Sequence, residues 1–139
     1  MSFVLDSSVA LSWCFRDEQS DESLEILTLA RAQAVFVPSL WHLEMANVLG
    51  MAFRRQRLHE NDLAWALRLF TTLDMHTDTA SPTINTSVLL PLMQAYSLTA
   101  YDAVYLELAL RLDLPLATLD RELAAASENA GVTLLGRVS

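Results

Sequence analysis

The sequence contains no lysine, and all nine of its basic residues are arginines. Seventeen acidic residues outnumber them, so the formal net charge is -8 at pH 7. This charge argues against a broad nucleic-acid-binding surface that works by counterion release. Any polyanion must therefore be held locally, or through bound cations.

Cysteine is almost absent as well, because Cys14 is the only one. An internal disulfide is impossible, and no Cys pair or His-x-x-x-His pair offers a zinc site. We interpret Cys14 as a buried, inert thiol in preference to a reactive one. The three histidines lack ligand spacing, so we assign them surface or packing roles.

Long apolar runs are missing too. No stretch approaches the roughly 18 consecutive apolar residues of a membrane span, and the opening MSFVLDSS lacks the basic segment and cleavage site of a signal peptide. We therefore expect a cytoplasmic protein without membrane contact. With 139 residues and 53% apolar content, the chain 1–139 is predicted to fold as one domain with a sizeable core.

Short apolar runs alternate with helical patterns along the chain. Strands are predicted at 3–5, 34–38, 75–79, 115–119 and 132–136. Helices are predicted at 7–15, 21–33, 39–57, 60–73, from Ser81-Pro82 to Tyr96, 99–112, and from Arg121 to a stop at Gly131. This alternation indicates an α/β fold with a largely parallel sheet.

Two acidic residues immediately follow strand-like runs. Asp6 follows FVL, and Asp120 follows PLATL. In open parallel sheets, sites form beyond the carboxyl ends of strands, so both carboxylates should point to the same rim. Asp102 lies in the first turn of its helix, and Glu44 lies in the helix after the second predicted strand. All four acids can therefore converge.

Three of these acids have a simpler explanation as helix caps. Asp6 and Asp120 would be the N-caps of the helices that follow them. Asp102 would be the last residue of a capping-box-like Thr99-x-x-Asp102. Taken singly, each of these patterns favours capping.

Glu44 is harder to explain in that way, because LWHLEMANVLGMAF surrounds it with apolar neighbours. A carboxylate rarely enters such a face unless it is paired or metal-bound. Asn47 shares its helix face and could hydrogen-bond a ligand carboxylate or a water. The alternative is that Glu44 lies at the edge of the apolar stripe and pairs with an arginine.

Convergence of the four acids would have an electrostatic consequence. Mutual repulsion would raise their pKa values and destabilise the site, which is tolerable only where a cation normally binds. Carboxylates without His or Cys are hard oxygen ligands. They suit Mg²⁺ or Mn²⁺, ions that commonly act on phosphate esters.

The segments that carry these acids resemble the PIN-domain nucleases, with the spacing of VapC-type toxins across almost the whole chain. FVLDSS resembles the family's opening strand with its first acid and serine, and LEMANVL resembles the segment with Glu44 and Asn47. TAYDAVYLELA and LATLDREL resemble the last two acidic motifs, which are the most specific. The resemblance implies a PIN-like α/β fold whose central, mostly parallel sheet has about four to five strands flanked by helices.

The resemblance also implies an activity. One or two divalent metals, Mg²⁺ or Mn²⁺, would be held by the four acids, Asp6, Glu44, Asp102 and Asp120. Support for ligands or waters would come from Ser7, Asn47 and Thr118. The metals would activate a water for in-line attack on an RNA phosphodiester. A small antitoxin would neutralise the protein, with an arginine or lysine that enters the acidic site.

Few basic side chains are available to contact RNA phosphates. The best basic patch is Arg54, Arg55 and Arg57 in FRRQR, which would either contact phosphates or be a solvated helix end that complements the macrodipole. Arg121 would contact phosphate or pair with an acid.

Two aromatic residues bear on the oligomeric state. The helices with Trp41 and Trp65 carry wide apolar faces, which a chain of 139 residues need not bury completely. We therefore expect a homodimer, with core packing as the other role for these two side chains.

Two other functions compete with the nuclease interpretation. A phosphotransfer or receiver-like protein would also place a strand-end Asp near Mg²⁺, but such families generally use a lysine, and the chain has none. A non-catalytic interaction module, with the acids as caps and surface charges, leaves Glu44 and the joint motif match unexplained. The sequence favours a metal-dependent endoribonuclease.

Overall fold

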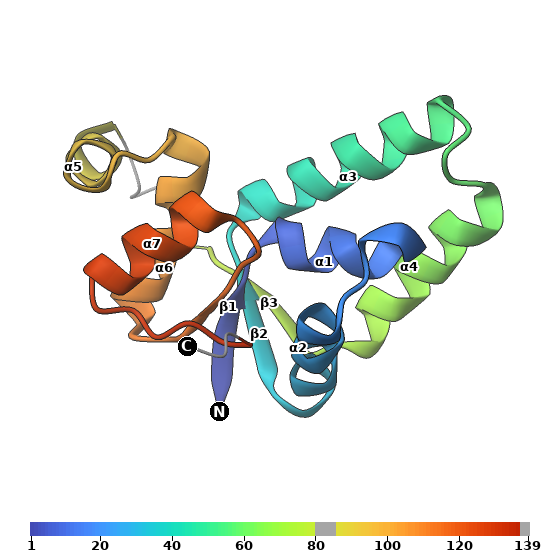
Figure 1. Cartoon of the computed structure of the whole chain (residues 1–139), viewed down its shortest axis with the longest axis horizontal. Coiled ribbons are helices and arrows are strands. Elements are labelled where there is room, and N and C mark those ends of the chain that lie inside the picture. Colours follow the sequence, from blue (N-terminus) through green and yellow to red (C-terminus); the bar gives the residue numbers. More distant parts are fainter. Residues whose placement is uncertain (80–85, 137–139) are drawn as a thin grey trace.

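A four-stranded sheet lies at the centre of the computed structural model, which describes residues 1–79 and 86–136 (Figure 1). The strands are β1 (Ser2–Leu5), β2 (Ala34–Val37), β3 (Met75–Thr77) and β4 (Leu116–Ala117). Their order is β3-β2-β1-β4, and every pairing is parallel. The inner strand β1 has Phe3, Val4 and Leu5 fully buried, as expected for a sheet covered on both faces. The predicted α/β fold with a parallel sheet is confirmed.

Helices cover both faces of this sheet (Figure 1). One layer holds α1 (Ser7–Cys14), the short 3-10 helix η1 (Arg16–Glu18), α2 (Asp21–Ala32), α3 (Ser39–Arg54) and α4 (Glu60–Thr72). The other layer holds α5 (Thr86–Tyr96), α6 (Ala100–Leu112) and α7 (Arg121–Asn129). Helix α1 contacts α2 and α3, and α6 contacts β1 and β4. No described helix is both long and apolar enough to cross a membrane.

The long helix α3 matters most for the site, because it runs from the sheet edge to the far side of the molecule (Figure 1). It begins at Ser39, the first residue of the predicted range, and Pro38 is its N-cap residue. It continues through Gly50, as expected. It ends at Arg54, three residues before the predicted end, because Gln56 adopts a left-handed backbone conformation with φ 62°.

The last predicted strand, 132–136, is reduced to a single bridge between Leu134 and Leu116. The neighbouring strand β4 is two residues long and offers no longer ladder to pair with. The predicted helix start at Ser81-Pro82 lies outside the described residues, and the helix is described from Thr86.

The two tryptophans expected on a dimer-forming face differ in their surroundings. Trp41 is 3% exposed and packs edge-to-face on Phe70, with ring centroids 5.3 Å apart. Trp65 is 43% exposed. Core packing is therefore the role of Trp41, and Trp65 alone of the two presents its ring to the surface.

Candidate active site

The parallel pairing of β1 and β4 brings two acidic residues to one edge of the sheet. Leu5 lies opposite Ala117 in this pairing, so the chain leaves both strands at the same level. Asp6 follows β1 directly, and Asp120 follows β4 as the N-cap residue of α7.

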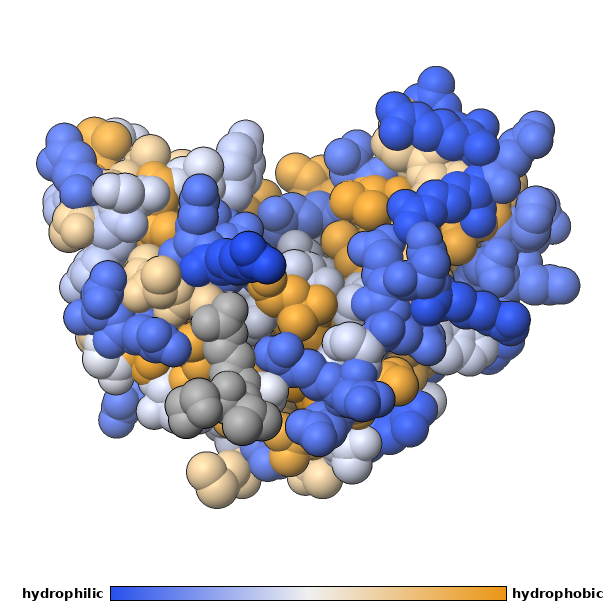
Figure 2. Space-filling model, in the orientation of Figure 1, coloured by the Kyte–Doolittle hydropathy of each residue, from blue (hydrophilic) through white to orange (hydrophobic). Residues whose placement is uncertain are grey.

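Helices α3 and α6 add the other two acids, Glu44 and Asp102, to the same place. A hollow of about 340 Å³ is lined by nine residues: Asp6, Ser7, Ser8, Leu11, Glu44, Asn47, Val48, Asp102 and Asp120. We call it the acidic hollow. Figure 2 shows the surface indented between the block of α5 to α7 and the block of α3 and α4. The structure thus brings all four predicted acids together, with Ser7 and Asn47 among them.

Asp6 is the most buried of the four, with 5% of its surface exposed. It occupies the N-cap position of α1 but makes no side-chain cap bond. Its Oδ2 instead accepts hydrogen bonds from Ser8 Oγ at 2.6 Å and Thr118 Oγ1 at 2.7 Å. Burial raises the pKa of Asp6, the two hydroxyl donors oppose this, and the charges of Glu44 and Asp120 add to it. Helix capping does not explain Asp6.

Glu44 is half-buried, and its partners come from the opposite layer and from α1. Its Oε1 accepts hydrogen bonds from the Tyr105 hydroxyl at 2.5 Å and from Ser7 Oγ at 3.2 Å. Burial first, and then the bond to Glu44, raise the pKa of Tyr105, which therefore stays a protonated donor. None of the ion pairs in the described part of the chain involves Glu44, so the alternative of an arginine partner is wrong.

Asp120 does act as a helix cap, since its Oδ1 accepts a hydrogen bond from the Leu123 backbone N–H at 3.0 Å. Its own N–H donates to Thr118 Oγ1 at 3.0 Å, so Thr118 joins Asp120 to Asp6. Asp120 therefore both caps α7 and lines the acidic hollow.

Asp102 lies one turn into α6, where its backbone N–H donates to Thr99 Oγ1 at 3.2 Å. Its carboxylate does not bond the Thr99 backbone N–H, so the predicted capping box is only half formed, although a side-chain hydrogen bond with Thr99 favours the charged carboxylate and lowers its pKa. Burial, followed by the charges of Asp120 and Asp6, raises the pKa of Asp102 from 3.8 to about 6. Burial and the charges of the other acids therefore both disfavour the charged form of Asp102.

The donor set of the acidic hollow suits a hard divalent cation. Four carboxylates line it, together with hydroxyl and amide groups, and none of its lining residues is His, Cys or Arg. Within residues 1–79 and 86–136, however, no three Asp, Glu, His or Cys side chains lie close enough together to hold a metal ion as they stand. A cation bound there would have to draw the carboxylates together.

A sequence profile of the PIN domain matches residues 3–129. The chain belongs to the PIN domain family. Members of this family are typically nucleases, and they usually use divalent metals. At this coarse level, the comparison supports a hydrolase.

The PIN fold of the chain is similar to that in the crystal structure of PAE2754 from Pyrobaculum aerophilum, with a TM-score of 0.64. The similarity covers 91% of this chain and 79% of the other, at 22% sequence identity. At that identity the similarity concerns the fold. No curated protein matches the chain by sequence.

Two residues of this PIN domain site were missed in the sequence. Tyr105 and Ser8 each donate a short hydrogen bond to one of the four acids. Ser8 is the last residue of the DSS motif that begins with Asp6. Tyr105 lies three residues after Asp102 on the same helix, so the two side chains lie near one helix face. This spacing could have indicated Tyr105 as a residue of the site.

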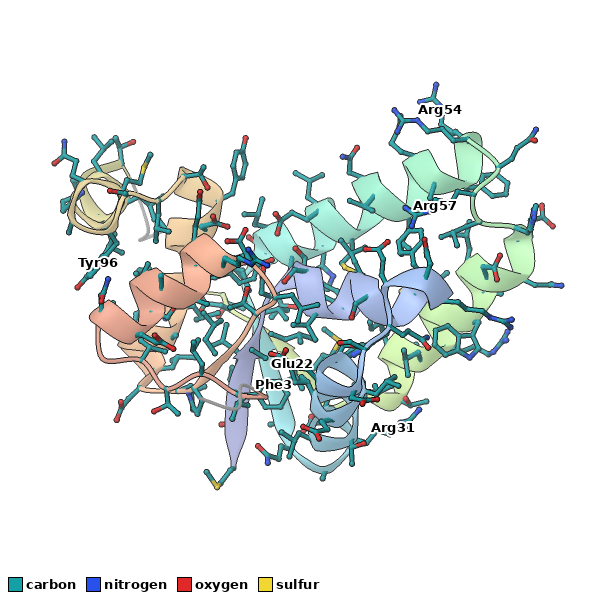
Figure 3. The ribbon with its side chains drawn as sticks, viewed as in Figure 1. Phe3, Glu22, Arg31, Arg54, Arg57 and Tyr96 are labelled. Carbon is teal, nitrogen blue, oxygen red and sulfur yellow. The ribbon has the colours of Figure 1, made fainter. Side chains whose placement is uncertain are left out.

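The three arginines of the predicted basic patch have different surroundings in the structure. Arg57 donates to Glu18 at 2.8 Å and to Asp17 at 3.3 Å, and its guanidinium lies 4.2 Å from the centre of the Phe15 ring. Arg54 projects into solvent from the end of α3 (Figure 3). Arg55 and Arg57 both line another hollow of about 420 Å³, which shares Asn47 and Val48 with the acidic hollow.

Proposed function

We propose that this PIN domain is a metal-dependent endoribonuclease in which Asp6, Glu44, Asp102 and Asp120 hold Mg²⁺ or Mn²⁺. One observation carries the proposal: four carboxylates from four separate segments line one hollow without a basic side chain. Such an arrangement costs folding free energy unless a cation is bound. The alternative of a non-catalytic interaction module gives no reason for it.

A bound divalent metal would activate a water and neutralise charge on a phosphodiester. The protein's own groups fix the carboxylates for that purpose. Ser8 and Thr118 hold Asp6 through one oxygen, Oδ2. Glu44 is held through Oε1 by Tyr105 and Ser7, and Asn47 on the rim is exposed and could bind a ligand carboxylate, a water or a phosphate oxygen.

Arg55 is the basic residue best placed to contact an RNA phosphate, because the hollow that it lines adjoins the acidic hollow and, unlike Arg57 in the same hollow, it takes part in none of the ion pairs found among the described residues. Arg57 serves as its matched control, since its ion pairs with Asp17 and Glu18 occupy it in the fold. We expect Arg55→Ala to weaken RNA binding and flatten its salt dependence. Arg57→Ala should lower the melting temperature with little effect on the salt slope, and the reverse pattern would contradict the assignment.

The VapC-type resemblance supports a toxin role, in which a small antitoxin inserts an arginine or lysine into the acidic hollow. We further propose that residues 1–139 form one domain, that the protein acts in the cytoplasm, and that it is a homodimer. Expression of the chain alone should arrest growth, and co-expression with an adjacent antitoxin gene should restore it. Normal growth during expression of the active chain would count against the toxin role.

The activity is tested by incubation of the purified protein with mixed cellular RNA in Mg²⁺, in Mn²⁺ and in chelator. Cleavage should require a divalent metal, and Glu44→Gln and Asp120→Asn should abolish it. Glu25→Gln, which changes an exposed carboxylate in α2, is the matched control and should cleave normally. Cleavage that persists in chelator would overturn the proposal.

A further inference from the structure

Another hollow, distinct from the one lined by Arg55, adjoins the acidic hollow where α3 faces the start of α6. It has a volume of about 450 Å³ and is lined by Leu40, Leu43, Glu44, Asn47 and Tyr101. We call it the aromatic hollow. Glu44 and Asn47 line both hollows, so the two lie side by side. Its volume lies within the range of small-ligand pockets, roughly 300–1,000 Å³.

The position of Tyr101 follows from the helix that carries it. Tyr101 and Tyr105 are four residues apart on α6 and therefore share one helix face. Tyr105 reaches Glu44 with its hydroxyl, so Tyr101, one turn earlier, lies beside the same stretch of α3.

Two of the side chains that line the aromatic hollow are unusually exposed. Tyr101 is 63% exposed and Leu43 is 69% exposed. The ring contacts found among the described residues do not include Tyr101. An aromatic face is therefore open to a ligand directly beside the acids.

We propose that the aromatic hollow holds a nucleobase of single-stranded RNA, stacked on Tyr101 and next to the phosphate that the acidic hollow receives. The inference rests on the proposed nuclease function and adds a specificity-determining residue to it. Bases of single-stranded RNA commonly stack on aromatic side chains, because every base has a π-face. A base is neutral, so it can bind a chain of net charge -8 without repulsion.

The polar wall of the hollow favours a base over an apolar protein segment. The amide of Asn47 can hydrogen-bond the edge of a base. An apolar side chain would cover that amide without replacing its hydrogen bonds to water, which is unfavourable. A chain without lysine can form few ion pairs with phosphate. Stacking of bases would supply binding affinity from another source.

The test measures binding of fluorescently labelled oligo(A) and oligo(U) to the full chain in Ca²⁺, with gels to verify that the RNA stays intact. The unaltered protein should bind oligo(A) more tightly, because purines stack more strongly. Tyr101→Ala should weaken oligo(A) binding about tenfold and remove the preference, whereas Tyr101→Phe should retain both. Trp65→Ala, which removes another exposed ring, is the matched control and should bind normally.

Unchanged binding by Tyr101→Ala would overturn the inference, as would equal losses in Tyr101→Ala and Trp65→Ala. A switch from dimer to monomer in Tyr101→Ala, with RNA binding unchanged, would assign the hollow to a second copy of the chain and also overturn it. Cleavage in Mn²⁺ is measured on the same RNAs. Metal-dependent cleavage with Tyr101-independent binding refutes this inference alone, whereas Tyr101-dependent binding without cleavage refutes the proposed function alone.

Discussion

Replacement of Asp102 by Asn should stabilise the metal-free protein, because its carboxylate is partly buried and is repelled by Asp120 and Asp6, and the Thr99 hydrogen bond offsets only part of this cost. The pKa of Asp102 is raised from 3.8 to about 6. At about 1.4 kcal/mol for each pH unit, the full penalty at pH 7.5 would be about 3 kcal/mol. Because Asp102 is only half-buried, solvent screening reduces the expected gain to about 1 kcal/mol. For a chain of this size, that gain raises the melting temperature by about 3 °C.

The pH dependence separates repulsion from a general effect of the substitution. The folded state binds a proton at Asp102 more tightly than the unfolded state, so this carboxylate destabilises the fold increasingly as pH rises through the window from 3.8 to about 6. The gain from Asp102→Asn should therefore be complete at pH 7.5 and only a small fraction of that near pH 4.

The assay is thermal unfolding in chelator at both pH values, with Glu25→Gln as the exposed control. Glu25→Gln should change stability by less than about 0.5 kcal/mol. Destabilisation by Asp102→Asn at pH 7.5, or an equal gain at both pH values, would refute the reasoning.

Three further outcomes are expected. Tyr105→Phe should destabilise the protein by about 1.5 kcal/mol in urea unfolding, because it removes a hydrogen bond to the charged Glu44; a neutral effect would contradict the observed contact. Burial raises the pKa of Cys14 to about 11, so its reaction with a thiol reagent at pH 8 should be far slower in the folded protein than in urea, and equal rates would refute this. Mn²⁺ at roughly ten times its Kd should stabilise the unaltered protein by about 1.4 kcal/mol, and Asp120→Asn distinctly less; equal shifts in calorimetry would argue against a shared site.

Those parts of the site that follow from strand ends could be predicted from the sequence. Asp6 directly follows β1 and Asp120 lies three residues after the end of β4, and a parallel sheet brings such positions to one edge. Glu44 was predicted because its apolar surroundings left a carboxylate without an explanation. The fold class followed from the alternation of apolar runs with helical patterns, since that alternation determines parallel pairing.

Other features depend on contacts that no local pattern encodes. The bond from Tyr105 to Glu44 spans 61 residues, and the pairing of Arg57 with Glu18 spans 39. Residues 132–136 have the pattern of a strand, but pairing needs a neighbour of sufficient length, and β4 has two residues. Local propensity predicts which segments can pair, whereas the tertiary structure decides how far the pairing extends.

The central claim is that the four carboxylates form one site for divalent metal, and direct Mn²⁺ binding tests it without RNA. Electron paramagnetic resonance of free Mn²⁺ gives the bound fraction for the unaltered protein, for Glu44→Gln and Asp120→Asn, and for the control Glu25→Gln. We expect the unaltered protein and Glu25→Gln to bind with equal affinity, and both site variants to bind at least tenfold more weakly. Equal binding by all four proteins, or binding by none, would contradict the claim that the acidic hollow is a metal site.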